Sequence, residues 1–250
     1  MISKKKLNNL LGRFGVELHG TGYLQALTKG DFNQDHFQVQ KNIIKKKNPI
    51  IFDIGANTGS ITAKYLEYFP AAHIYAFEPF PNSFEHLVNR HKSNANITCI
   101  EKAVASTNGS REFFVNKNVD TNSLLRPQKT GLSSDEQVSN ISTIKVDTIV
   151  LDEFCRTANI PYIDILKMDI QGGEFDALQG LKEMLQNNGI GIIYSEVYFV
   201  EQYEGQPLYH DIAKLLVSFG YYVQDIYNPI YGKGSLAWAD VIFTKRALDW

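Results

Sequence analysis

The chain has 250 residues, 44% of them hydrophobic, which is enough to bury the core of one α/β domain with an N-terminal extension. Its 25 basic and 27 acidic residues give a net charge of −2. The chain therefore lacks the basic excess of a nucleic-acid-binding protein, and we expect no nucleic-acid partner. Two cysteines are too few for a disulfide framework and no apolar run predicts a transmembrane segment or a signal peptide, so we expect a cytoplasmic protein.

The first 47 residues precede the first predicted strand and are expected to form a helical extension. Apolar residues recur at helical spacing between Leu7 and Leu18, and residues 31–44 form a second candidate helix before three lysines. Such a segment packs on a sheet edge or on a partner subunit, which leaves a homo-oligomer open. A helix lying on a membrane surface is a weaker alternative. Residues 48–250 form the second predicted domain.

The next stretch predicts a ligand site. Ile50–Phe52 is an apolar run typical of a buried parallel strand, and helical spacing begins after Gly59. Strand, glycine turn and helix form the first unit of a nucleotide-binding α/β sheet, whose ligands lie at the carboxyl ends of the strands. The candidate binding residues of this turn are Asp53, Gly55, Ala56, Asn57, Thr58 and Gly59.

The turn reads D-x-G-x-N-x-G and opens with a carboxylate, Asp53. A carboxylate is a poor neighbour for a pyrophosphate but a good one for a sulfonium and an ammonium group. The helix N-terminus after Gly59 could hold a ligand carboxylate. S-adenosylmethionine (SAM) carries these groups and no phosphate. A turn without a ligand is the structural alternative.

A second acid follows the next predicted strand, His73–Phe77. Glu78 lies 25 residues after Asp53, close to the offset of about 20 residues at which such folds place a ribose-binding acid. A carboxylate there accepts hydrogen bonds from both ribose hydroxyls. Pro79 ends the strand and precedes the next helix. An exposed acid at a strand end is the alternative.

Further along, residues 97–100 read as a third strand that continues through residues 101–104, and residues 111–115 and 144–149 read as further strands. Residues 118–141 are polar and lack periodicity. A loop of this length is expected to be either a lid over the cleft or a mobile surface loop.

The last third of the chain contains a central strand, residues 162–169, that carries charge only near its end at Lys167 and Asp169. Residues 190–194 form the next strand and deliver Glu196 to the same edge, and a helix follows with His210 near its start. Residues 221–227 and 239–244 are closing strands, the last of which we expect to be antiparallel.

Together these pieces resemble the FkbM family of SAM-dependent methyltransferases over about residues 48–245. The resemblance rests on Phe52–Gly59, Phe77–Pro79, Thr121–Leu124, Ile165–Glu174 with Leu178–Gly180, and Ser195–Glu196. It implies a Rossmann-like class I methyltransferase with a mostly parallel seven-stranded sheet, helices on both faces and an antiparallel closing strand.

The resemblance also implies that Ala103 contacts the adenine and that Ser123 contributes to the SAM site. The family more often has Glu where this chain has Gln171, which removes an acidic role at that position.

Methyl transfer from a sulfonium needs alignment, and a hydroxyl acceptor also needs a base. Asp169 and Glu196 at adjacent strand ends are the candidate catalytic residues, with His210 next. The two carboxylates could instead hold a divalent cation such as Mg²⁺. A salt bridge between Asp169 and Lys167 is the structural alternative.

By family analogy we expect O-methylation of a sugar hydroxyl on a glycan, glycolipid or glycosylated metabolite. Two alternatives stay open: a module that binds SAM without turnover, and a nicotinamide-dependent oxidoreductase. Asp53 and the absence of a third glycine disfavour the oxidoreductase.

Overall fold

The computed structural model describes residues 35–128, 138–232 and 234–245. The helix expected between Leu7 and Leu18 lies outside these residues. The chain divides into two units, residues 1–39 and 40–250, and apart from residues 35–39 everything described below lies in the second. The domain boundary expected after residue 47 stays a prediction.

Within the described residues, seven strands form the main sheet in the order β3-β2-β1-β7-β8-β10-β9. β10 runs antiparallel to the other six strands, which confirms the expected Rossmann-like class I architecture. Its strands are β1 (Ile50–Ile54), β2 (His73–Phe77), β3 (Ile97–Ile100), β7 (Ile163–Met168), β8 (Ile190–Tyr198), β9 (Tyr222–Gly232) and β10 (Ser235–Thr244).

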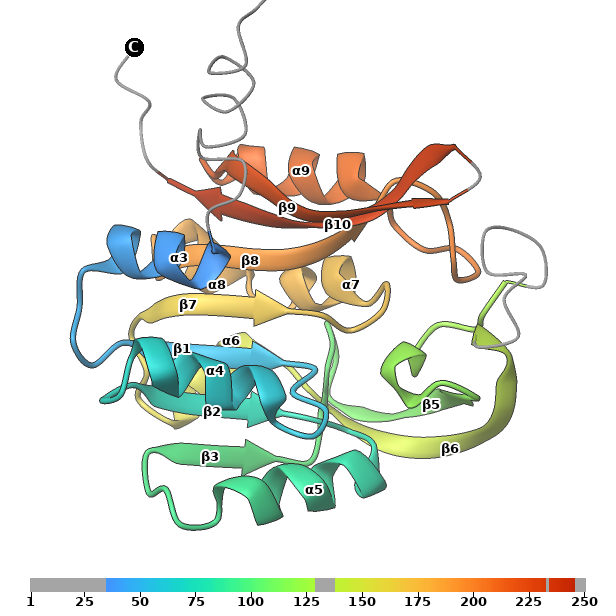
Figure 1. Cartoon of the computed structure of the whole chain (residues 1–250), viewed down its shortest axis with the longest axis horizontal. Coiled ribbons are helices and arrows are strands. Elements are labelled where there is room, and N and C mark those ends of the chain that lie inside the picture. Colours follow the sequence, from blue (N-terminus) through green and yellow to red (C-terminus); the bar gives the residue numbers. More distant parts are fainter. Residues whose placement is uncertain (1–34, 129–137, 233, 246–250) are drawn as a thin grey trace, which may run out of the picture. The chain divides into compact units, whose positions relative to one another are not determined.

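The interior strands are buried on both faces because helices cover both faces of the sheet. All six residues of β7 are buried. Figure 1 shows α4 and α5 on one face of the sheet and α6 to α9 on the other. The helices are α3 (His36–Ile44), α4 (Ser60–Tyr68), α5 (Pro81–His91), α6 (Leu151–Thr157), α7 (Glu174–Gln179), α8 (Lys182–Gln186) and α9 (Tyr209–Ser218). None of these described helices is long and apolar enough to cross a membrane.

A second, small sheet lies beyond the carboxyl ends of β1 to β3 (Figure 1). Its order is β4-β6-β5, and its strands are β4 (Ala103–Val104), β5 (Gly109–Asn116) and β6 (Asn140–Ile149). The expectation that residues 101–104 continue the third strand is wrong. β3 ends at Ile100, and Ala103 pairs with Thr148 in the small sheet.

Two segments next to the small sheet are hydrogen-bonded to each other. The first segment contains the short 3₁₀ helix η2 (Val119–Thr121). An isolated β-bridge joins Pro127 of this segment to Tyr203 of the second. Gln128 N donates to Gln202 O at 3.0 Å, and Glu204 N donates to Arg126 O at 2.8 Å. We call residues 118–128 and 198–206 the paired loops.

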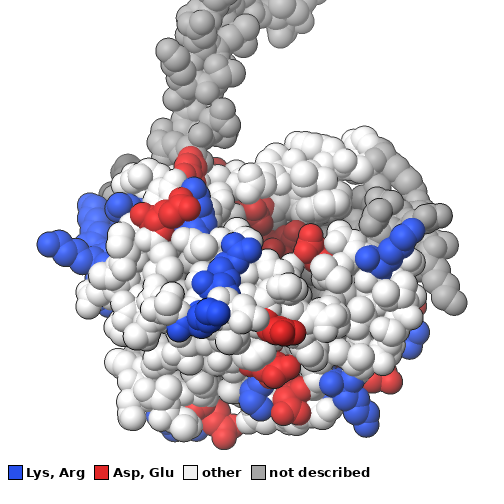
Figure 2. All heavy atoms as spheres, turned by 60° about the horizontal axis from the view of Figure 1, so that its bottom comes forward, with Lys and Arg blue, Asp and Glu red and all other residues white. Residues whose placement is uncertain are grey.

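The strands after β7 are longer than the sequence predicts. β8 was expected to end at Tyr194, but antiparallel pairing with β10 continues until Tyr198 faces Trp238. Glu196 therefore lies inside a strand and not after its end. On the face seen in Figure 2, basic and acidic side chains are interspersed.

Candidate active site

A cavity of about 650 Å³ opens at the carboxyl ends of β1, β2 and β7. The chain order reverses between β1 and β7, and ligands of open α/β sheets bind at such a switch point. The volume is typical of small-molecule sites. Of the candidate site residues, the cavity is lined by Gly55, Ala56, Asn57, Thr58, Glu78, Pro79, Ala103, Asp169 and Glu196.

The glycine turn between β1 and α4 forms one wall. A side chain at Gly55 would place its Cβ 2.0 Å from the carbonyl oxygen of Asp169, and φ at Gly55 is +78°. Glycine is therefore required where the loops after β1 and β7 pass each other. Asn57 Nδ2 donates to Asp120 Oδ1 at 2.7 Å, whereas Asn57 Oδ1 is buried and has no hydrogen-bond partner among the described residues.

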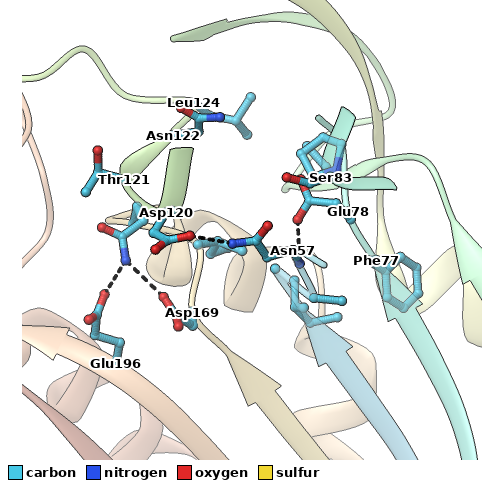
Figure 3. Close-up of a pocket in the computed structure, with 18 of the residues that line it drawn as sticks. Asn57, Phe77, Glu78, Ser83, Asp120, Thr121, Asn122, Leu124, Asp169 and Glu196 are labelled. Carbon is cyan, nitrogen blue, oxygen red and sulfur yellow. Dashed lines mark hydrogen bonds between the residues drawn. The ribbon is translucent and has the colours of Figure 1, made fainter. Parts of the chain in front are cut away.

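Glu78 lies at one end of the cavity, after β2 (Figure 3). Its carboxylate accepts hydrogen bonds from the backbone N–H groups of Asn57 (2.8 Å) and Phe80 (2.9 Å), which fix its orientation. Burial raises its pKa to about 7. Apolar side chains around it include Phe77, Ala103 and Phe113. A carboxylate beside an apolar pocket suits a ribose with its attached base.

Asp53 does not line the cavity. It is fully buried under the turn, where Thr62 Oγ1 donates to it at 2.6 Å and Lys167 Nζ lies 3.0 Å from its Oδ1. Phe52 and Ile54 face the core beneath α6 to α9, so strand alternation turns Asp53 towards α4. The expected direct contact of Asp53 with a ligand cation does not agree with this placement.

Lys167 forms its salt bridge with Asp53. The sequence analysis had given a salt bridge with Asp169 as the structural alternative. Its Nζ also donates to the backbone oxygen of Gly55 at 3.0 Å. Burial lowers the pKa of this ammonium group, but the carboxylates of Asp53 and Asp169 outweigh burial and leave the pKa raised. Lys167 is therefore a charged group that holds the turn from below.

At the other end of the cavity lie Asp169 and Glu196 (Figure 3). Gln171 Nε2 donates to Asp169 Oδ1 at 2.9 Å and to Glu196 Oε2 at 2.8 Å. Tyr198 OH lies 2.6 Å from Glu196 Oε2. Burial raises the pKa of Glu196 well above its usual range, and the nearby Asp169 carboxylate raises it further. The two acids expected from the sequence are thus brought together.

Three other candidates lie outside the cavity lining. Gly59 precedes α4 and packs on His91. Ser123 is buried and donates from Oγ to the Gln171 carbonyl at 2.7 Å, so it supports the cavity wall. His210 is exposed at the start of α9 and lies 3.6 Å from its neighbour Asp211. Its position agrees with a surface residue and not with a base.

Sequence reasoning missed several lining residues, of which Tyr198 had a usable signal. It follows Glu196 by two positions in a strand and therefore shares its face. Tyr203 and Trp238 reach the cavity through the paired loops and β10, for which no local pattern exists. The other missed lining residues include Asp120, Asn122 and Gln202.

The sheet order, the glycine turn after β1 and the acid after β2 define a class I, SAM-dependent methyltransferase. The residues present fit SAM, since Glu78 suits the ribose and the unpaired Asn57 Oδ1 is an acceptor for its ammonium group. The methyltransferase FkbM domain family matches residues 53–223. The chain belongs to this family, as the sequence predicted.

Three curated relatives are similar to the chain. The 2-O-methyltransferase NoeI of Sinorhizobium fredii is 33% identical over 184 residues, 71% of this chain and 75% of the relative. The hexuronic acid methyltransferase AglP of Haloferax volcanii is 22% identical and aligns with 59% of this chain and 56% of its own length. The methyltransferase sdnD of Sordaria araneosa is 25% identical over 54% of this chain and 61% of its own length.

Proposed function

We propose that the protein transfers the methyl group of SAM to a hydroxyl group of a sugar, in a glycan, a glycolipid or a glycosylated metabolite. The observation that carries the proposal is one cavity with two different ends. Glu78 and the apolar pocket lie at the donor end, and Asp169 and Glu196 at the other. Methyl transfer to a hydroxyl needs this separation, because donor and acceptor must meet in line between the ends.

The acceptor end suits a sugar. Tyr198, Tyr203 and Trp238 line it, and the rings of Tyr198 and Trp238 lie 6.1 Å apart. Gln202 is 5% exposed, and its Nε2 has no hydrogen-bond partner among the described residues. Aromatic faces with an unused amide donor match the apolar ring faces and hydroxyl oxygens of a sugar. The names of NoeI and AglP, which modify a 2-O position and a hexuronic acid, agree with this class.

SAM supplies an activated methyl group on a sulfonium. The residues of the chain align the acceptor and receive its proton. We assign Asp169 as the base, since it lines the cavity beside the glycine turn. Bound SAM would supply the methyl carbon to the acceptor oxygen and keep the electron pair of its carbon–sulfur bond on sulfur, while Asp169 would take the hydroxyl proton.

The finer expectations stay proposals. Among the described residues, no group of three or more His, Cys, Asp or Glu side chains is arranged to hold a metal ion, and we do not include Mg²⁺ in the proposed reaction. Both cysteines are free, in keeping with the cytoplasmic location that we propose. A homo-oligomer and a lid role for residues 118–141 are left to experiment.

The first test is binding of S-adenosylhomocysteine and of NAD by calorimetry, for wild type and Glu78→Ala. We expect S-adenosylhomocysteine alone to bind, and Glu78→Ala to weaken it at least about tenfold through loss of two hydrogen bonds. Labelled methyl transfer from SAM to neutral glycosides and to uronic acids then identifies the acceptor, with Asp169→Asn as the inactive control. Binding of NAD instead would sink the proposal, and S-adenosylhomocysteine binding without transfer to any sugar would favour a non-catalytic module.

A further inference from the structure

Gln171 contacts both acids of the site through one amide group. Its two Nε2 hydrogens are used by Asp169 Oδ1 at 2.9 Å and Glu196 Oε2 at 2.8 Å. Its Oε1 lies 2.9 Å from both Tyr198 OH and Tyr203 OH. The reverse amide orientation would aim an oxygen at two carboxylates, so the network itself fixes which end is nitrogen.

The backbone of Gln171 is fixed as well. Its φ is +54°, a left-handed value that is uncommon for a residue with a side chain. Its carbonyl oxygen accepts a hydrogen bond from Ser123 Oγ at 2.7 Å, which ties the loop after β7 to the segment after η2. The amide is therefore held in place from both ends of the residue.

The hydrogens around this amide can be counted. Tyr198 OH contacts Gln171 Oε1 and Glu196 Oε2, and Tyr203 OH contacts Gln171 Oε1 and Thr121 O at 2.9 Å. The oxygens of Gln171 and Thr121 only accept, and each phenol has one hydrogen. These four contacts have two phenol hydrogens between them, and a proton on Glu196 supplies a third. Glu196 then donates to Tyr198, Tyr198 to Gln171 and Tyr203 to Thr121, and one contact, between Tyr203 OH and Gln171 Oε1, is left without a hydrogen instead of two.

The charges around Glu196 favour the same state. Asp169, Glu174 and Asp240 act on it as further carboxyl groups, while the phenols of Tyr198 and Tyr203 are neutral. The buried cation nearby, Lys167, is paired with Asp53. Two carboxyl groups that share one site cannot both ionise easily, so one member of the pair Asp169 and Glu196 keeps its proton.

We propose that Gln171 is a positioning residue that takes the place of a metal ion, so that Asp169 is the ionised base and Glu196 a neutral partner that carries a proton. A divalent cation would have to bind oxygens of both carboxylates at about 2.0–2.6 Å, in the space that the amide nitrogen fills. The amide gives both acids a hydrogen-bond donor without adding a charge. The proposal deepens the proposed methyl transfer and rests on it for the role of Asp169.

The test uses the full chain with ¹³C-labelled side-chain carboxyl groups of Asp and Glu, titrated by NMR. The signals are assigned with Asp169→Asn and Glu196→Gln. At pH 7 we expect Glu196 to be protonated and Asp169 ionised in the wild type. In Gln171→Met, which keeps the volume but loses both donors, the carboxyl ¹³C signal of Asp169 at pH 7 should move from its wild-type position. An ionised Glu196 in the wild type, or an unmoved Asp169 signal in this variant, overturns the proposal.

A second variant covers the case in which Gln171→Met does not fold. Gln171→Glu replaces the bridging donor with a third carboxyl group, and we expect it to bind Mn²⁺ at least tenfold more tightly than the wild type, measured by calorimetry with Mn²⁺ alone. Asp169→Asn in the Gln171→Glu background should remove that binding. Mn²⁺ that binds the wild type as tightly, and is lost in Asp169→Asn, contradicts the proposal.

These measurements need no acceptor, so they stay interpretable if no sugar is methylated. Failure of S-adenosylhomocysteine to bind would remove the proposed function and leave the protonation states measurable. The dissociation constant of S-adenosylhomocysteine should stay within twofold of wild type in Gln171→Met. Unchanged binding shows that the variant is folded and has lost only the positioning of the two acids.

Discussion

The buried pair Asp53–Lys167 places two charges in the interior of the protein, where each depends on the other. Neither side chain is exposed by more than 4%, and the Lys167 ammonium group also donates to the backbone of the glycine turn. Removing one member leaves an uncompensated charge in the interior, whereas removing both does not.

We therefore expect Lys167→Met to lower the free energy of unfolding by about 3–5 kcal/mol. The double variant Asp53→Asn with Lys167→Met should recover a large part of that loss, because no buried charge is left alone. Urea unfolding followed by circular dichroism measures both. A loss below about 1 kcal/mol for Lys167→Met would mean that Asp53 is reached by water.

At the scale of single residues, the sequence predicted Glu78 and Asp169 because each follows an apolar strand. It did not predict the direction of Asp53. β1 is buried on both faces, so its pattern carries no signal of which face meets the ligand. It also did not predict Gln171, because three of its four side-chain partners, Glu196, Tyr198 and Tyr203, lie 25 to 32 residues further along the chain.

Among the elements, the start of α4 depends on Gly59. Its φ is +80°, and a Cβ there would lie 2.6 Å from His91 Nε2 and 2.8 Å from Leu87 Cδ1. Gly220 offers a matched position after α9, since its φ is +79° and no atom lies within 4 Å of its would-be Cβ.

Gly220→Ala should cost only the backbone strain, about 1 kcal/mol. Gly59→Ala should cost about 2 kcal/mol more, because α5 must shift to accept the methyl group. Gly59→Ala should also weaken the binding of S-adenosylhomocysteine, since the glycine turn moves with α4. Thermal unfolding with and without the ligand compares the two variants. Equal losses would show that α5 adapts freely.

The elements that the sequence predicted well are the interior strands β1, β2 and β7, whose continuous apolar runs need no partner to be recognised. The extent of β8 and β10 depends on their pairing with each other. The small sheet also contains β4, a strand of two residues that local patterning does not mark.

For the whole molecule, stability should depend on pH through buried acids. Burial raises the pKa of both Glu78 and Glu174 to about 7. The folded protein then binds a proton more tightly than the unfolded chain, so stability falls as the pH rises from about 4.5 through 7. The full effect is about 3 kcal/mol for each group.

Urea unfolding of the ligand-free protein between pH 5.5 and 8 measures this fall. Glu174→Gln should flatten it, because the amide oxygen can still accept from Ile170 N, as the carboxylate does at 2.9 Å. S-adenosylhomocysteine should bind more tightly as the pH rises, since we propose that ionised Glu78 accepts hydrogen bonds from both ribose hydroxyls. Stability that rises over this range contradicts the placement of these acids.

The paired loops have a consequence for how acceptor preference can change. Residues 118–128 and 198–206 share a β-bridge and two backbone hydrogen bonds, and both contribute residues to the cavity lining. If only one of the two loops were replaced by that of a relative, its backbone would have to pair with a loop from a different protein. The two loops therefore form one exchangeable cassette, and a chimera with a new acceptor range must carry both halves and keep Asp120, which accepts a hydrogen bond from Asn57 of the glycine turn.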